Sequence, residues 1–356
     1  MRKASTGERR SRSNPESGPS TLKTLDLTEG TGRLVFDTQA TSSNLREVQI
    51  ENAAPKPASR WLTRGNSGDS QPAYSPDGAR VIFRSNRSGN WNLWEMATAS
   101  GALRRITDDP GTDWDPGFTP DGKKILWTAN RSGNFEIWIA DTDGSNARQV
   151  THDGSDAQSG TATPDGWVAY VSANPAKQGL WKVRVDGSQA TRLVEGLIGP
   201  PEVSPDGKYA AYFTFDDGLK VVRMEDGAKV PFKFRSLSIT QPRWMPGGRA
   251  IALLRWNEKT AANEVYVQDF DPGKDTSKTR RKLTRTFDDM NFTTFGISPD
   301  GSRIVVAHQL GGSNLMTAER VPGVLPPMRK KSAATSTSLS LRGSGDPEQP
   351  HAAGSV

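Results

Sequence analysis

The chain has 356 residues, of which 33% are hydrophobic and none is cysteine, so disulfides and thiolate chemistry are excluded. No apolar run approaches the roughly 20 residues of a membrane helix, so no membrane span is predicted. The net charge is +6, but its excess lies at the ends: residues 1–20 carry five basic and two acidic side chains, and residues 322–356 carry four and two. The nearly neutral middle argues against nucleic-acid binding by the folded part.

The two basic ends are also poor in apolar residues, which predicts disordered tails at 1–20 and 322–356. The first of them lacks the apolar core of a signal peptide. The folded part is expected to occupy residues 21–321.

One phrase repeats along this folded part. Residues 72–94 read PAYSPDGARVIFRSNRSGNWNLW, and residues 117–138 read GFTPDGKKILWTANRSGNFEIW. The proline of the Ser/Thr-Pro-Asp-Gly element occurs in six copies, at spacings of 44, 44, 41, 41 and 53 residues: Pro76, Pro120, Pro164, Pro205, Pro246 and Pro299. A nearly fixed period of this size marks a repeat architecture. A fainter copy lies upstream at residues 27–36.

Each period divides into four short strands. The first leads into the Ser/Thr-Pro-Asp-Gly turn, where proline presets φ and Asp-Gly suits a tight reversal. The second is almost wholly apolar, as in Ile125-Leu126-Trp127, which indicates burial on both faces. The third alternates, and the fourth is short and often basic, as expected of an exposed edge. Four antiparallel strands per period predict an all-β propeller.

The number of blades depends on how the ring closes. Counting the faint upstream copy favours seven blades. The last period, however, ends after its predicted third strand at residues 314–319, so residues 21–27 would have to pair with the final blade. Six blades with an additional N-terminal hairpin is the alternative.

The Ser/Thr-Pro-Asp-Gly turn, the apolar strand, Asn-Arg-Ser-Gly-Asn and the Ile/Leu-Trp pair together resemble the TolB-type β-propeller repeats. Propeller sensor domains of bacterial regulators and receptor-like kinases look most similar. The resemblance implies a binding or sensing role in an extracytoplasmic, for example periplasmic, bacterial setting, although no signal peptide is present. Propellers of prolyl-oligopeptidase-type peptidases also look similar, so the repeat specifies fold more than function.

The sequence offers little catalytic chemistry. It lacks the Gly-x-Ser-x-Gly nucleophile elbow, a kinase catalytic loop and a phosphate-binding loop. Its three histidines, His152, His308 and His351, are too few for a histidine-bound metal. We therefore expect a non-enzymatic protein. An enzyme acting on carbohydrate or peptide through carboxylates at the pore, or a fragment of a larger sensor or peptidase, is the alternative.

The candidate partner-binding face lies where the connections between blades meet the turns between second and third strands. These segments share one end of a propeller and bring together acids, arginines, amides and an aromatic ring: Asp69, Asn86, Arg87, Asp113, Trp114, Asp115, Asn130, Arg131, Asp156 and Asp288. Such a mixture suits a protein or peptide ligand. The structural alternative is that Asp and Arg pair with each other across adjacent blades. No cofactor is predicted, although these acids could hold a divalent cation such as Ca²⁺ in the channel, and a monomer is expected.

Overall fold

The computed structural model describes residues 21–28, 33–50, 59–215, 217–234, 241–259, 262–283, 292–319 and 342–343. The chain divides into two compact units, Ser42–Leu310 and a second that combines Met1–Thr41 with Gly311–Val356. The tails predicted at 1–20 and 322–356 lie outside the described residues, apart from the short strand β26 (Arg342–Gly343). No helix among the described residues is long and apolar enough to cross a membrane.

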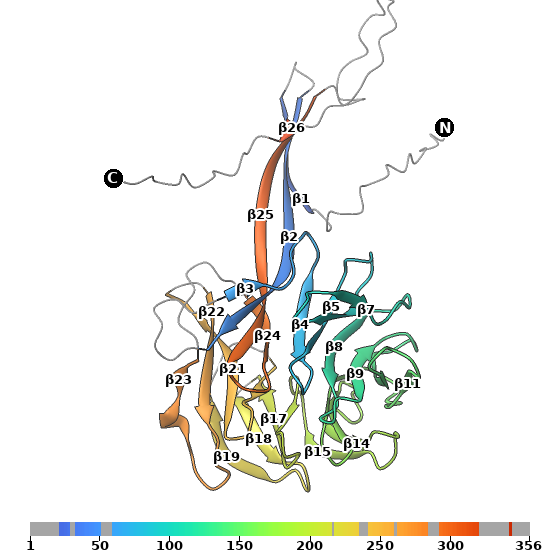
Figure 1. Ribbon diagram of the computed structural model, residues 1–356, viewed down its shortest axis with the longest axis vertical. Helices are drawn as coiled ribbons and strands as arrows, with labels where there is room; N and C mark the ends of the chain where they lie inside the picture. The colour runs from blue at the N-terminus through green and yellow to red at the C-terminus, as the bar shows by residue number, and fades with distance from the viewer. Residues whose placement is uncertain are drawn as a thin grey trace, which may run out of the picture. The chain divides into compact units, whose positions relative to one another are not determined.

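Five four-stranded antiparallel sheets follow one another along the Ser42–Leu310 unit and form five blades around a common axis (Figure 1). The strands of each blade are given from the innermost to the outermost. The first blade has β4 (Asp69–Tyr74), β5 (Arg80–Ser85), β6 (Asn92–Ala97) and β7 (Leu103–Arg105), and the second has β8 (Asp113–Phe118), β9 (Lys124–Ala129), β10 (Glu136–Asp141) and β11 (Arg148–Gln149). The third has β12 (Ala157–Ala162), β13 (Trp167–Ser172), β14 (Gly179–Arg184) and β15 (Thr191–Glu195), the fourth has β16 (Glu202–Val203), β17 (Tyr209–Thr214), β18 (Gly218–Arg223) and β19 (Lys229–Phe234), and the fifth has β20 (Arg243–Trp244), β21 (Ala250–Asn257), β22 (Ala262–Asp269) and β23 (Arg281–Lys282). A short 3₁₀ helix, η1 (Ser277–Thr279), precedes β23.

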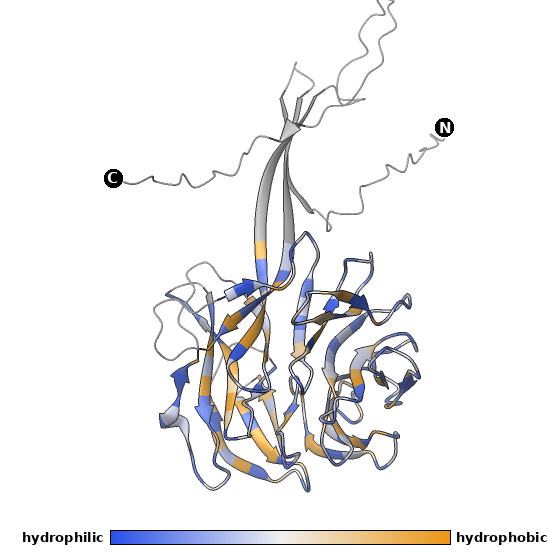
Figure 2. Cartoon of the chain, in the orientation of Figure 1, coloured by the Kyte–Doolittle hydropathy of each residue, from blue (hydrophilic) through white to orange (hydrophobic). Residues whose placement is uncertain are grey.

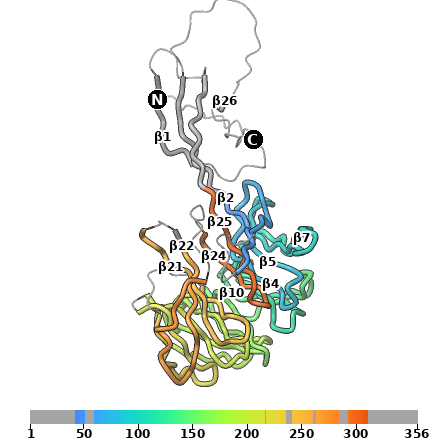
Figure 3. The backbone as a smooth tube through the Cα atoms, turned by 60° about the vertical axis from the view of Figure 1, so that its left-hand side comes forward, coloured from blue at the N-terminus to red at the C-terminus, as the bar shows by residue number. Residues whose placement is uncertain are grey.

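The sixth blade is built from both ends of the chain. Its inner strands are β24 (Phe292–Ile297) and β25 (Arg303–Glu319), and its outer strands are β2 (Arg33–Gln49) and β3 (Ser59–Trp61). β2 and β25 run side by side in Figure 3, although their sequences are far apart. The ring therefore has six blades, and the prediction of seven was wrong.

Two features of the ends explain the error. The faint copy at residues 27–36 has lost the Pro-Asp-Gly turn, and it forms a plain hairpin between β1 (Thr21–Thr28) and β2, with Leu27 opposite Leu34. Residues 314–319 do not return as a third strand, because they continue β25. The third position of the last blade is filled by β2, whose Leu45 and Val48 are fully buried.

The turn chemistry predicted for each repeat is present. In the first blade the Gly78 amide donates to the Ser75 carbonyl oxygen at 2.8 Å, and the Asp77 carboxylate accepts from the Ala79 amide at 3.0 Å. Gly78 has φ +70°, which favours glycine at this position. The hydroxyl of Ser75 bonds Asp77 and the Arg80 amide, so one tetrapeptide closes the loop between the first two strands.

The apolar second strands form the core between the blades. Phe83, Trp127 and Tyr170, which recur in register, are 0%, 0% and 3% exposed. Figure 2 shows the hydrophobic residues concentrated on the strands, while the turns are hydrophilic. Each buried cluster joins neighbouring blades; one combines Leu45 and Val305 of the sixth blade with Phe83 of the first. Because packing of this kind repeats around the ring, the inner strands are held rigidly about the axis.

Candidate functional site

A ring of side chains from the six inner strands and the segments leading into them surrounds the axis of the propeller. In every copy the residue four positions before the first residue of the Ser/Thr-Pro-Asp-Gly turn, or of its degenerate equivalent, lines the same cavity of about 270 Å³. The six members, one per blade, are Gln71, Asp115, Ser159, Pro200, Gln241 and Thr294. The repeat therefore places one position of each blade in the channel.

Three of these strands bulge at the channel. Gln71, Asp115 and Ser159 have φ of 55°, 48° and 56°, and the pairing of each inner strand with its neighbour shifts at these residues. A bulge re-aims a side chain by leaving one residue of the strand unpaired. Left-handed backbone at a non-glycine residue costs about 1–3 kcal/mol and persists only where the surroundings hold it.

Each bulged amide is held by a side chain from another strand. The amide of Gln71 donates to Thr294 Oγ1 at 2.9 Å, that of Asp115 to Gln71 Oε1 at 3.0 Å, and that of Ser159 to Thr128 Oγ1 at 3.0 Å. The strained backbone is thus fixed by hydrogen bonds between blades.

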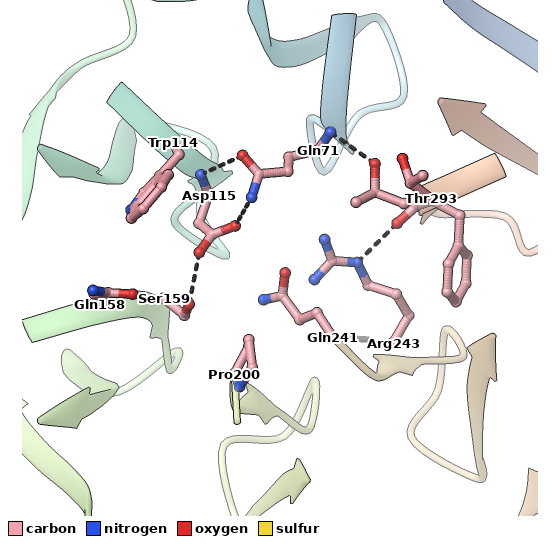
Figure 4. A pocket seen from close by; sticks show the side chains of 11 residues that line it. Gln71, Trp114, Asp115, Gln158, Ser159, Pro200, Gln241, Arg243 and Thr293 are labelled. Carbon is pink, nitrogen blue, oxygen red and sulfur yellow. Dashed lines mark hydrogen bonds between the residues drawn. The ribbon is translucent and has the colours of Figure 1, made fainter. Parts of the chain in front are cut away.

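A chain of side-chain hydrogen bonds crosses three blades at this level (Figure 4). Gln71 Nε2 donates to Asp115 Oδ1, and Ser159 Oγ donates to Asp115 Oδ2 at 2.6 Å. Burial raises the pKa of the Asp115 carboxyl above its ordinary value, and the Ser159 hydroxyl, Arg243 and Arg84 oppose this only in part. The charged form of this acid is therefore less well solvated than that of an exposed aspartate.

A second ring lies two residues further along each inner strand. Its members, Ala73, Gly117, Thr161, Glu202, Arg243 and Gly296, line an adjoining cavity of about 180 Å³. Asp115, Gln241 and Arg243 border both cavities. Three members of this ring, Ala73, Gly117 and Gly296, are small. Two of the other three form an ion pair.

Arg243 and Glu202 form this pair. Arg243 Nη1 lies 2.9 Å from Glu202 Oε2, and Arg243 Nε donates to the Phe295 carbonyl oxygen at 3.1 Å. Burial raises the pKa of Glu202, an effect that Arg243 opposes and Asp115 reinforces. The lining of the two cavities accordingly includes two carboxylates with raised pKa values, Asp115 and Glu202, and the arginine Arg243.

The acids and arginines of the predicted face form pairs inside single blades. Arg87 pairs with Asp69 at 2.8 Å, and both belong to the first blade. Arg131 lies 2.6 Å from Asp109 and 3.6 Å from Asp113 in the second blade. Asp69 and Asp113 are 0% exposed. These four predicted residues connect strands of their own blade, neither facing outward nor bridging to the next blade.

The other predicted residues divide between scaffold and channel. Asn86 Oδ1 accepts a hydrogen bond from the Gly68 amide, and Asn130 Oδ1 accepts one from the Thr112 amide, each at 2.7 Å. Each asparagine thus holds the segment that leads into the first strand of its blade. Asp156 accepts the Phe135 amide at 3.1 Å. Asp288 lies outside the described residues.

Trp114 and Asp115 are the predicted residues that line the channel cavity. Gln71, Ser159, Gln241, Arg243 and Thr294 were not predicted. Their fixed offset from each turn was a signal present in the sequence. Among the described residues, no group of three or more His, Asp or Glu side chains is arranged to hold a metal. The channel-bound cation therefore stays a prediction.

Six four-stranded blades about a polar channel define the chain as a β-propeller protein. The family model of the TolB beta propeller domain matches residues 46–226, just over half of the chain. The chain belongs to this family.

Among solved structures, a putative TolB from Agrobacterium tumefaciens superposes with a TM-score of 0.61 at 18% identity, covering 76% of this chain and 99% of that one. TolB from Acinetobacter baumannii gives 0.53 at 18% identity, covering 76% and 65%. These similarities show the fold.

Two curated proteins match shorter stretches. An uncharacterized peptidase, YuxL of Bacillus subtilis, is 28% identical over 128 residues, which is 32% of this chain and 18% of that protein. The uncharacterized protein Atu1656 of Agrobacterium fabrum is 38% identical over 47 residues, or 13% and 16%. The matched part thus spans less than a fifth of the length of either relative.

Proposed function

We propose that this chain is a non-enzymatic binding propeller whose channel entrance receives a segment of another polypeptide. The observation that carries the proposal is the ring formed by Gln71, Asp115, Ser159, Gln241 and Thr294, which presents hydrogen-bond donors and acceptors toward one cavity. Three of these residues are held in strained backbone by bonds between blades. Strain that the fold maintains at a cavity supports a role in binding.

The size of the cavities favours part of a chain over a whole domain as the ligand. Volumes of about 270 and 180 Å³ fall at or below the lower limit of sites for small molecules. A side chain or a chain end can enter, while the rest of a partner would contact the surrounding loops. Amides, hydroxyls and one arginine match the alternating donors and acceptors of a peptide backbone.

The test is selection of peptides from a displayed random library on the full chain, followed by affinity measurements on variants. Gln71→Ala and Asp115→Asn should weaken the selected peptides, because they remove channel contacts. Lys229→Ala, an exposed position on the outer strand β19, is the control and should bind as the wild type does. Equal binding by all three variants, or no enrichment of peptides, would overturn the proposal.

A second candidate, an enzyme acting on carbohydrate or peptide, is favoured by one observation. The pKa values of Asp115 and Glu202 are both raised by burial in the same channel, which suits general acid catalysis. Hydrolysis of members of a glycan and peptide panel, abolished by Asp115→Asn and by Glu202→Gln, would establish it. Since the matched stretch is only 18% of YuxL, a role as the binding part of a larger protein is compatible with the first proposal.

A further inference from the structure

Arg84 lies on β5 between two tryptophans, opposite Ser70, which directly precedes the channel-lining residue Gln71. Its guanidinium carbon lies 4.1 Å from the ring centroid of Trp91 and 5.8 Å from that of Trp114. Trp114, which lines the cavity, stacks in turn on Phe135, with centroids 4.4 Å apart and planes 15° apart. Cation–π contacts of this kind fix the plane of the guanidinium and leave its edge open.

The edge of that guanidinium is not used within the protein. Arg84 Nε donates to Ser70 Oγ at 2.9 Å, whereas the two terminal nitrogens have no hydrogen-bond or ion-pair partner among the described residues. Burial lowers the pKa of Arg84, and the charge of Asp115 opposes this only in part. A half-buried cation without a bound carboxylate costs free energy that folding must supply.

Three other arginines at this end of the ring are paired. Arg87 binds Asp69, Arg131 binds Asp109, and Arg243 binds Glu202. In those three the guanidinium completes an internal contact. Arg84 has the same chemistry at the same end of the propeller but has no such contact.

The repeat shows that the scaffold does not require a cation at this position. Arg84 lies in β5, directly after Phe83, the large buried residue of the second strand. The corresponding residues of the blades that follow carry no charge; in chain order they are Thr128, Val171, Phe213, Leu254 and Ala307. A departure from the repeat beside the cavity-lining Trp114 indicates a role outside the fold.

We propose that Arg84, framed by Trp91 and Trp114, binds a carboxylate of the ligand that enters the channel. This inference rests on the proposed function and adds the chemistry of the ligand. Two parallel N–H···O bonds from a planar guanidinium suit a carboxylate, and the indole faces keep water from competing. A C-terminal carboxylate and an acidic side chain carry the same group.

Small probes of defined chemistry separate these two sources of the carboxylate. The full chain is titrated with N-acetylglycine, which mimics a chain end, with N-acetylglutamate α-amide, which mimics a side chain, and with neutral N-acetylglycinamide. Tryptophan fluorescence follows binding at constant ionic strength, since Trp91 and Trp114 flank the site. We expect saturable responses in the millimolar range to one or both carboxylates and none to the amide.

Arg84→Gln should weaken the response to carboxylate by about tenfold or more, as expected for loss of hydrogen bonds to a charged group. Arg84→Lys should restore it only in part, because an ammonium cannot bind in the bidentate manner. Arg184→Gln is the matched control: Arg184 stacks on Trp167 at the same 4.1 Å, and its Nη1 donates to the Asp165 carbonyl oxygen.

A wild-type protein that responds alike to carboxylates and to the amide would overturn the inference, and this measurement needs no variant to fold. Unchanged carboxylate binding by Arg84→Gln would do the same. If selected peptides depend on Gln71 and Asp115 but not on Arg84, the carboxylate site fails while the proposed function stands. If no peptide is selected, the proposed function fails, and the probe titration still decides whether Arg84 binds a carboxylate.

Discussion

Arg87 donates from Nη2 to both carboxylate oxygens of Asp69, at 2.9 and 2.8 Å, and the two residues belong to the same blade. Ser85 completes the contact, since its hydroxyl donates to Asp69 Oδ1 at 2.6 Å and accepts from Arg87 Nε at 2.9 Å. The guanidinium also covers Phe83 and Trp94, with its carbon 5.3 and 5.1 Å from their rings. One ion pair therefore holds together three strands of a blade.

Asp69→Ala should lower the free energy of unfolding by about 3 kcal/mol, because it leaves Arg87 without its buried partner. Chemical denaturation followed by circular dichroism measures the loss. Glu195→Gln, which breaks the exposed pair with Arg192, should change stability by less than about 0.5 kcal/mol. Equal effects of the two substitutions would contradict a structural role for the buried pair.

Leu45→Ala should cost about 3 kcal/mol, since Leu45 is fully buried where the two ends of the chain close the ring. Thermal unfolding of the variant checks this value. Leu103→Ala, at a leucine that is 44% exposed on the outer strand β7, is the control and should be nearly neutral. A small loss at Leu45 would mean that β2 contributes little to the sixth blade.

Gly117 and Gly160 should respond differently to the same added methyl group. A Cβ at Gly117 would meet no atom within 4 Å, so Gly117→Ala should fold normally and larger residues there should fill the second cavity. A Cβ at Gly160 would lie 2.9 Å from Ile137 and Leu126, so Gly160→Ala should cost about 1–3 kcal/mol. Unfolding curves of the two variants decide this.

Gly117→Leu offers a direct check of the channel. It should reduce the binding of peptides that reach the second cavity while leaving the melting temperature near that of the wild type. Unchanged binding would show that ligands stop at the first ring.

Asp113 should give a pH-dependent contribution to stability. Burial raises its pKa from 3.8 to about 6; Asp109 adds to this, and Thr107, Arg131 and Trp127 oppose it. The folded state therefore holds the proton more tightly than the unfolded state, so stability falls as pH rises from about 4 to about 6. The loss amounts to about 3 kcal/mol at 1.4 kcal/mol per pKa unit.

The difference in unfolding free energy between wild type and Asp113→Asn isolates this contribution. Between about pH 4 and about pH 6 the wild type should lose stability relative to Asp113→Asn. Above about pH 6 the difference between the two proteins should be constant. A difference that does not vary with pH would contradict the assignment of the proton to Asp113.

The repeat predicted the blades well, because turn geometry and buried strands are encoded locally. The turn Ser75-Pro76-Asp77-Gly78 forms hydrogen bonds within itself. Phe83 and Trp127 occupy the same position of the second strand in two repeats, and both are buried, as predicted for that strand. Closure of the ring was not predictable in the same way. Pairing of β2 with β25 depends on contacts between distant segments, and β2 lacks the Pro-Asp-Gly turn that marks a blade.

The predicted partner-binding face and the channel cavity share Trp114 and Asp115. In the sequence, Asp69 and Arg87 were interpreted as surface residues that contact a partner. Their charges alone do not reveal that the two side chains form an ion pair with each other. Gln71 and Ser159 were not predicted as site residues. The β-bulge that directs their side chains into the channel cannot be recognised from the residue types. Asp115 belongs to both sets, because an acid of the predicted face occupies the channel-lining position of its repeat.

The sixth blade also constrains the order in which the chain can fold during synthesis. Arg303 pairs with Glu47 across 256 positions of sequence. As the ribosome releases the chain, Leu45 and Val48 emerge early and lack their neighbours within the sixth blade, Val305 and Ile304, until β24 and β25 are made. Contacts of such sequence separation form slowly, and uncovered apolar strands invite aggregation. We expect the nascent protein to remain an open, chaperone-dependent arc of five blades until its last strands are translated.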